Sequence, residues 1–231
     1  MSSEWQPVTR SGLSVALLDV DGADCEALDD EALLPPEEKA RARRFRGEEL
    51  ARRFRRAHAA LRILLAREMG CAPAAVPILA AAGTKPRLPD SGLHFNLSHS
   101  QNLAAIVIAR GREVGIDVEV RVRDLGDVCA LAERAFHPCE AAALRALPER
   151  GRQEAFLRLW TVREALLKAM GTGLAAPREM IDASPVLAGV QWLQWGGWSV
   201  TTAPAPAGCY VALAAAGTGW GYRLVSPLFE R

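Results

Sequence analysis

The stretch FNLSHSQNLAAIVIARGREVGIDVEV, from Phe95 to Val120, combines strand-forming segments with two groups of polar side chains. Residues 103–109 and 114–120 are aliphatic and β-branched, so they predict two strands that meet at a turn over residues 110–112. One polar group stands at each end of the stretch: Asn96, Ser98 and His99, with Asn96 in a turn, and Asp117 and Glu119. A buried hairpin needs neither group, so both are candidates for a functional site.

Helical and extended patterns flank this stretch on both sides. Apolar residues three to five apart predict one amphipathic helix over residues 37–70, or two helices with a break at Gly47, and a stop at Gly70. Further helices are predicted over residues 127–135, 138–147 and 152–170, and strands over residues 13–20, 190–194, 198–202 and 210–215. We place the join between two subdomains near Gly111, which gives residues 1–110 and 111–231.

The composition is that of a globular protein. The 231 residues are 50% hydrophobic and carry a net charge of +1, which excludes a disordered chain and disfavours a protein that coats nucleic acid. The five cysteines are scattered and form no CxxC motif, so neither a disulfide framework nor a zinc site is expected. The chain begins without an apolar signal core, and its apolar runs are too short to cross a bilayer. We therefore expect a cytoplasmic protein.

Basic residues are concentrated in the predicted helix between residues 39 and 67, where the only acidic ones are Glu48 and Glu49. The basic residues are Lys39, Arg41, Arg43, Arg44, Arg46, Arg52, Arg53, Arg55, Arg56, Arg62 and Arg67. A solvated arginine face and a phosphate-binding surface both explain this pattern.

Acidic residues form a second concentration on the other side of Gly111. Asp117 and Glu119 are two apart on a predicted strand and project to the same side. Glu164 and Lys168 are four apart and share one face of the helix predicted over residues 152–170. An exposed strand edge and a simple salt bridge would account for the two pairs separately. Together, three carboxylates from Asp117, Glu119 and Glu164 would suit Mg²⁺, which usually has a phosphate partner.

Candidate phosphate-binding residues lie before Gly111. They are the basic helix, Lys85 in the sequence GTKP, and Ser98 with His99. The chain has no GxxxxGK[ST] motif, so it is not a P-loop enzyme. His58, His94 and His137 have no partner in the sequence pattern and are interpreted as structural residues. The tryptophans between residues 192 and 220 are expected to pack in the core rather than to stack on bases.

The order GTKP, FNLSHS, GIDVE and LWTVREALLKAMGTGL, between about residues 35 and 175, resembles the 4′-phosphopantetheinyl transferases. The resemblance is to the larger single-chain type, which activates surfactin synthetase and serves peptide and polyketide synthases. It implies an α+β fold, a pseudo-dimer of two similar subdomains with coenzyme A between them. It also implies a monomeric, Mg²⁺-dependent holo-carrier-protein synthase. This enzyme transfers the phosphopantetheine arm of coenzyme A to a serine of apo acyl or peptidyl carrier domains and releases adenosine 3′,5′-bisphosphate.

The resemblance also implies roles for individual residues. Asp117, Glu119 and Glu164 would hold the metal, and Lys168 would contact the pyrophosphate. The coenzyme A contacts would be Arg41 at the 3′-phosphate, Lys85, Pro86, Asn96, Ser98, His99 and Lys168. Asp117, Glu164 and Lys168 would be catalytic, with Glu164 as the base. Arg163 stands where many members have lysine, so the role of that position is open.

Two other classes of function are compatible with the same residues. One is a different enzyme of coenzyme A or nucleotides, such as a Mg²⁺-dependent pyrophosphate hydrolase. The other is a non-catalytic protein that binds coenzyme A, another polyphosphate or, through the arginine helix, nucleic acid. The three carboxylates favour a transferase over both, and neither nucleic acid nor a membrane is expected as a partner.

Overall fold

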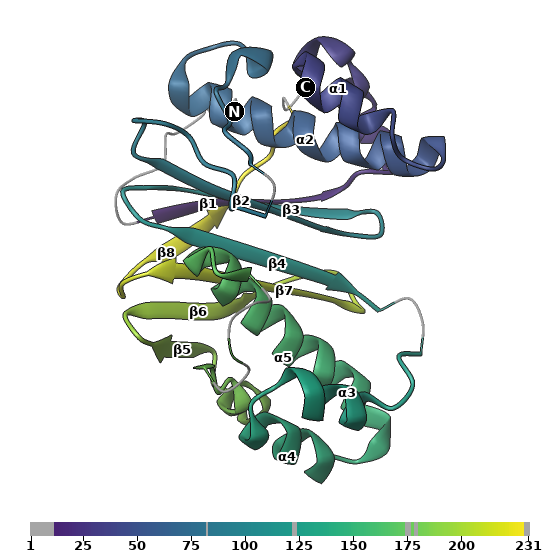
Figure 1. The fold of residues 1–231 in the computed structure, drawn as a ribbon, viewed down its shortest axis with the longest axis vertical. Coiled ribbons are helices and arrows are strands. Elements are labelled where there is room, and N and C mark those ends of the chain that lie inside the picture. Colours follow the sequence, from purple (N-terminus) through teal and green to yellow (C-terminus); the bar gives the residue numbers. More distant parts are fainter. Residues whose placement is uncertain (1–11, 82, 122–123, 174–176, 178–179, 229–231) are drawn as a thin grey trace, which may run out of the picture. The chain divides into compact units, whose positions relative to one another are not determined.

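The computed structural model describes residues 12–81, 83–121, 124–173, 177 and 180–228. The chain divides into two compact units, residues 1–111 with 220–231 and residues 112–219. Each unit contains a four-stranded sheet and a 22-residue helix, so the predicted α+β class is confirmed (Figure 1). The last strand, β8 (Gly221–Leu224), pairs in parallel with β1 (Gly12–Asp19) and so belongs to the first unit. The predicted second subdomain, residues 111–231, includes this strand instead.

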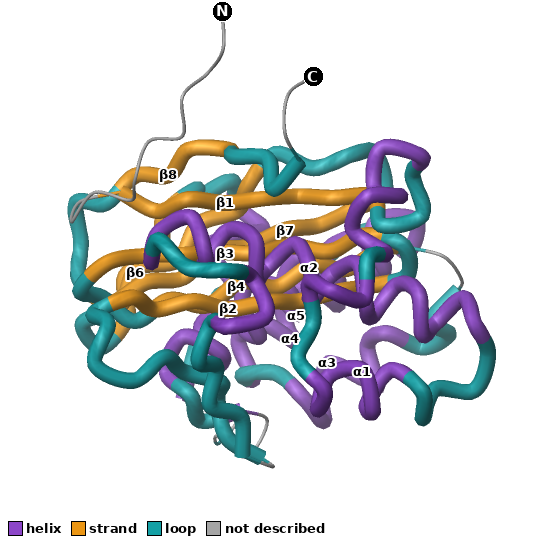
Figure 2. Tube along the Cα trace, turned by 90° about the horizontal axis from the view of Figure 1, so that it is seen from above, coloured by secondary structure: helices purple, strands orange, loops and turns teal. Residues whose placement is uncertain are grey.

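The sheet of the first unit has the order β2-β3-β1-β8, with β2 (Leu93–Ser100) and β3 (Leu103–Arg110) antiparallel to each other. Helix α2 (Glu48–Met69) packs on one face and buries a core with alternate residues of β1 and β3 (Figures 1 and 2). The shorter α1 (Pro36–Ala42) precedes it, so Gly47 does divide the predicted helix in two. The described residues of this unit also form 3₁₀ helices at Ala23–Asp29, Glu31–Leu33 and Pro73–Ala75.

One local prediction around the opening stretch is wrong. Asn96 is not in a turn, because β2 runs through it and the chain turns at Gln101, where φ is 55°. Phe95 and Leu97 face the core on alternate positions, and this period of two continues the strand through its polar residues. The strands β3 and β4 (Val114–Val120) do follow each other across Gly111, and they belong to different sheets.

The second unit has an antiparallel sheet in the order β4-β7-β6-β5, formed with β7 (Cys209–Ala216), β6 (Trp198–Ala203) and β5 (Trp192–Trp195). Helix α5 (Glu149–Met170) packs on one face of this sheet (Figure 1). Against α5 lie α3 (Val128–Ala135), α4 (Pro138–Ala146) and the 3₁₀ helix η6 (Ser184–Ala188). Trp195, Trp198 and Trp220 are buried or half-buried as expected, whereas Trp192 is exposed.

The arginines of α2 are largely engaged by carboxylates from outside the helix. Arg53 Nε donates to Asp21 Oδ2 at 2.9 Å and Arg55 Nε donates to Asp29 Oδ1 at 2.8 Å. The buried Arg62 makes a bidentate contact with Glu38, at 2.7 and 3.1 Å. Most of the helix's positive charge therefore stabilises the first unit, which weakens the interpretation of α2 as a nucleic-acid-binding surface.

Among the described helices, none is both long enough and apolar enough to span a membrane.

The ion pairs of Glu38 should make the first unit sensitive to acid. Burial would raise the pKa of Glu38, but the contact with His58 and the hydrogen bonds from Arg62 lower it to about 2. A carboxylate whose pKa is lower in the folded protein than in the unfolded chain stabilises the fold at any pH above its unfolded-state pKa. This stabilisation is lost as the pH falls through the pKa of the folded state. We expect Glu38→Gln to lower the free energy of unfolding at neutral pH by on the order of 3 kcal/mol, with the difference vanishing toward about pH 2.

Urea denaturation across this pH range measures the effect. Glu37→Gln, an exposed neighbour on α1, is the matched control and should follow the parent chain throughout. A constant difference between Glu38→Gln and the parent chain at all pH values would contradict the assignment.

Candidate functional site

In the second unit, β4 and α5 pack closely at Gly115. A Cβ atom on Gly115 would lie 2.1 Å from the Ala165 carbonyl oxygen and 2.4 Å from the Ala169 nitrogen. Across the strand pair, the neighbour of Gly115 is Ala214, which is fully buried. Small residues on both elements thus allow the helix backbone to approach the strand backbone, which explains the glycine of the GIDVE motif.

This approach brings Asp117 and Lys168 together. Asp117 is two residues after Gly115 on the same face of β4, and Lys168 lies in the last turn of α5. Lys168 Nζ donates to Asp117 Oδ1 at 2.6 Å, and the Asp117 side chain is 5% exposed. The left-handed Gly171 ends the helix directly after, and its N–H donates to the carbonyls of Leu167 and Lys168. The lysine is therefore held on a well-defined helix end.

Glu164 and Glu119 complete an acidic cluster around this pair. Burial raises the pKa of Glu164, and the negative charges of Asp117 and Glu119 raise it further, while Lys168 acts in the opposite direction. Asp117 is buried, and Glu119 and Glu164 are half-buried. Glu164 thus interacts electrostatically with the three other residues predicted from GIDVE and from the helix pattern, and we call these four residues the acidic cluster. Its donor set is three carboxylates, all hard oxygen ligands that suit Mg²⁺.

The other predicted residues belong to the first unit. Arg41 is exposed on α1, and its guanidinium lies over the Phe54 ring at 5.2 Å. Lys85 and Pro86 lie in the loop before β2. On β2, Asn96 and Ser98 are buried and His99 is exposed. Because side chains alternate along a strand, His99 projects from the face of β2 that packs toward α2, and Ser98 projects from the opposite face.

Arg163, next to Glu164 in the sequence, is buried and contacts other parts of the second unit. It is 5% exposed, and its Nη1 donates to Glu140 Oε2 at 2.9 Å and to the Ile181 carbonyl at 2.6 Å. Its guanidinium also lies over the Phe136 ring at 5.6 Å. Glu140 is completely buried and accepts a further hydrogen bond from the Ala183 N–H. Arg163 therefore joins α5 to α4 and to residues 181–183, a connection that sequence analysis missed.

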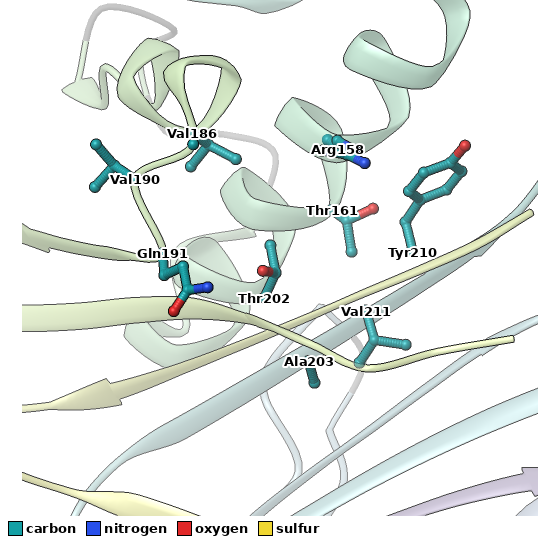
Figure 3. A pocket seen from close by; sticks show the side chains of 10 residues that line it. Arg158, Thr161, Val186, Val190, Gln191, Thr202, Ala203, Tyr210 and Val211 are labelled. Carbon is teal, nitrogen blue, oxygen red and sulfur yellow. The ribbon is translucent and has the colours of Figure 1, made fainter. Parts of the chain in front are cut away.

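A cavity of about 320 Å³ lies beside α5 in the second unit (Figure 3). Its lining includes Arg158 and Thr161 of α5, Gln191, Thr202 and Tyr210. Tyr210 is the cross-strand neighbour of Glu119, and burial raises the pKa of its hydroxyl. The lining residues within the described part of the chain include none of those predicted for the site. No sequence signal pointed to this cavity because its walls come from separate segments.

Comparisons with known proteins agree on one family. Residues 113–211, which include the whole acidic cluster, match the 4′-phosphopantetheinyl transferase superfamily. The chain is 38% identical over 205 residues to the 4′-phosphopantetheinyl transferase HetI of Nostoc sp. (strain PCC 7120), covering 87% of this chain and 86% of HetI. It is 34% identical over 187 residues to the L-aminoadipate-semialdehyde dehydrogenase-phosphopantetheinyl transferase of Eremothecium gossypii, covering 75% and 65%. It is 27% identical over 147 residues to Sfp of Bacillus subtilis, covering 63% and 64%.

The packing at Gly115 predicts opposite effects for two glycine-to-alanine changes. Gly115→Ala should lower the free energy of unfolding by about 1–3 kcal/mol or more, because the new methyl group must displace the α5 backbone. Gly151→Ala is the matched control, since this helical glycine has open space around it and alanine favours the helix by roughly 0.5–1 kcal/mol. Chemical denaturation measures both changes, and equal stability of Gly115→Ala and the parent chain would contradict the close-packing argument.

The environment of Arg163 predicts a structural role that a double-mutant cycle can isolate. Arg163→Met leaves Glu140 buried without its cationic partner and should cost about 3–5 kcal/mol. The double change Arg163→Met with Glu140→Gln should cost clearly less than the sum of the two single changes. Denaturation of the four proteins gives the coupling free energy. Additive effects would show that the two side chains do not stabilise each other.

Proposed function

Because the chain belongs to the 4′-phosphopantetheinyl transferase superfamily, we propose that the acidic cluster of β4 and α5 is where it transfers the 4′-phosphopantetheine group from coenzyme A to carrier proteins. The observation that supports this site is the concentration of Asp117, Glu119 and Glu164 around Lys168 within the region that matches the family. Three acids and one lysine on rigid elements suit a reaction at a pyrophosphate, where charge must be balanced and positioned.

We propose Asp117, Glu119 and Glu164 as the residues that hold Mg²⁺. The donor set fits, because all the ligand atoms are carboxylate oxygens and their mutual repulsion already raises the pKa of Glu164 beyond the effect of burial. When bound, Mg²⁺ would neutralise negative charge on the pyrophosphate oxygens of coenzyme A.

The side chains of the cluster have separate roles in the proposed reaction. Glu164 accepts the proton of the carrier serine hydroxyl as the serine oxygen forms its bond to the β-phosphorus. A carboxylate bonded directly to Mg²⁺ is less basic, so this role requires a looser or water-mediated contact between Glu164 and the metal. The bond from that phosphorus to the bridging oxygen breaks, and adenosine 3′,5′-bisphosphate leaves. Lys168 stabilises the negative charge on the leaving oxygen, and its hydrogen bond to Asp117 positions the ammonium group.

Residues of the first unit are proposed to bind coenzyme A. Arg41 is a suitable partner for the 3′-phosphate, because it is exposed and Phe54 supports its guanidinium. Lys85, Pro86, Asn96, Ser98 and His99 are proposed as further contacts. Arg53, Arg55 and Arg62 already pair with carboxylates of the chain, so they are weaker candidates.

The carrier substrates proposed are peptidyl and acyl carrier domains of peptide, polyketide and fatty acid synthases, and the protein is proposed to act as a cytoplasmic monomer. All five cysteines are free thiols, which agrees with a reducing compartment.

Intact-mass analysis of an apo carrier protein after incubation with this protein, coenzyme A and Mg²⁺ tests the proposal. The carrier should gain one phosphopantetheinyl group. Glu164→Gln should slow this transfer by about 10²–10⁴-fold while coenzyme A binding is retained, because the change removes a base but little of the binding surface. Asp117→Ala should abolish transfer.

Glu154→Gln, on the exposed face of the same helix, is the matched control and should transfer at the parent rate. Near-normal transfer by Glu164→Gln would overturn its assignment as the base. Consumption of coenzyme A without any carrier would identify a pyrophosphate hydrolase instead, and coenzyme A binding without turnover across a panel of carriers would identify a non-catalytic binder.

A further inference from the structure

A second group of potential metal ligands lies away from β4 in the second unit. His137, Cys139 and Asp182 each offer one ligand atom, and these atoms lie within 4.8 Å of one another. His137 and Cys139 stand at the beginning of α4, whereas Asp182 comes from the segment before η6. His137 is half-buried, and Cys139 and Asp182 are exposed, so the group is accessible from solvent.

The backbone on both sides of this group is held by one buried carboxylate. Glu140 Oε2 accepts from the His137 N–H at 2.7 Å, and Glu140 Oε1 accepts from the Ala183 N–H at 2.9 Å. Arg163 then ties Glu140 to the Ile181 carbonyl. The two segments that carry the ligands are therefore fixed relative to each other before any ion binds, which reduces the entropy lost on binding.

We propose that His137, Cys139 and Asp182 form a binding site for a borderline divalent metal, with Zn²⁺ as the preferred ion. An imidazole nitrogen, a thiolate sulfur and a carboxylate oxygen are all ligands that Zn²⁺ accepts, and three protein ligands leave a fourth position for water. The set is poorly suited to Mg²⁺, which prefers oxygen ligands. This site is therefore chemically distinct from the carboxylate cluster of Asp117, Glu119 and Glu164.

Binding changes the state of two of the ligands. The Cys139 thiol releases its proton to solvent as the sulfur bonds to the metal. The Nδ1 atom of His137 accepts from the Cys139 N–H at 3.1 Å as the cap of α4. Metal bound at Nδ1 replaces this hydrogen bond, and metal bound at Nε2 requires the other tautomer, so in either case the cap is exchanged for a metal ligand.

The position of the site predicts what the metal does. It joins the beginning of α4 to residue 182, the two segments that Arg163 connects to α5 next to Glu164. Metal binding should therefore stabilise the second unit, because an ion that binds the folded state and not the unfolded state raises stability.

Cobalt absorption and zinc calorimetry on the full, chelator-treated protein test the site. With Co²⁺ the parent chain should show one thiolate-to-cobalt charge-transfer band, and with Zn²⁺ it should bind one ion and unfold at higher temperature. Cys139→Ser should lose the band and weaken Zn²⁺ binding by at least about tenfold. Asp182→Asn should also weaken Zn²⁺ binding. Cys71→Ser, which removes an exposed thiol of the first unit, is the matched control and should bind like the parent.

Circular dichroism of the metal-free variants establishes that they are folded. A cobalt band that persists in Cys139→Ser, or equal losses in Cys139→Ser and Cys71→Ser, would overturn the proposal, as would a parent chain that shows neither the band nor Zn²⁺ binding. Because none of these readouts involves transfer activity, their outcome is independent of the proposed transferase function.

Discussion

The close approach of α5 to β4 at Gly115 is the constraint on which the acidic cluster depends. A side chain at this position would enter the α5 backbone at Ala165, so only glycine allows the two elements to pack in this way. The same approach places Lys168 in hydrogen-bonding contact with Asp117. One short motif thus determines both packing and chemistry. Its glycine allows β4 and α5 to approach closely, and the carboxylates two and four residues later lie on the strand that the helix approaches.

Charge is used differently in the two units. In the first unit the arginines of α2 mostly pair with Asp21, Asp29 and Glu38, so a pattern that looked like a phosphate-binding face is largely internal. In the second unit the carboxylates of β4 and α5 outnumber their cationic partner Lys168, and the excess charge raises the pKa of Glu164. The unbalanced cluster is the one suited to a metal and a pyrophosphate.

Several elements of the fold followed from the sequence, and the failures have identifiable causes. The long helices were predicted because their apolar periodicity extends over many turns and ends at Gly70 and Gly171. The turn propensity of asparagine predicts a turn at Asn96, but the alternation of Phe95 and Leu97 toward the core keeps this residue in β2. The strand β8 was missed because a short strand depends on its partner, here β1, which is distant in the sequence.

The sequence by itself determined the helix periods, the GIDVE strand and the i,i+4 spacing of Glu164 and Lys168, since these are local patterns of one segment. Only the tertiary structure decided which charges meet. It showed that Arg163 pairs with the buried Glu140, and that Asp182 lies beside the beginning of α4. Such pairings depend on the packing of segments far apart in the chain, and the pattern of one segment carries no information about the partner that another segment will supply.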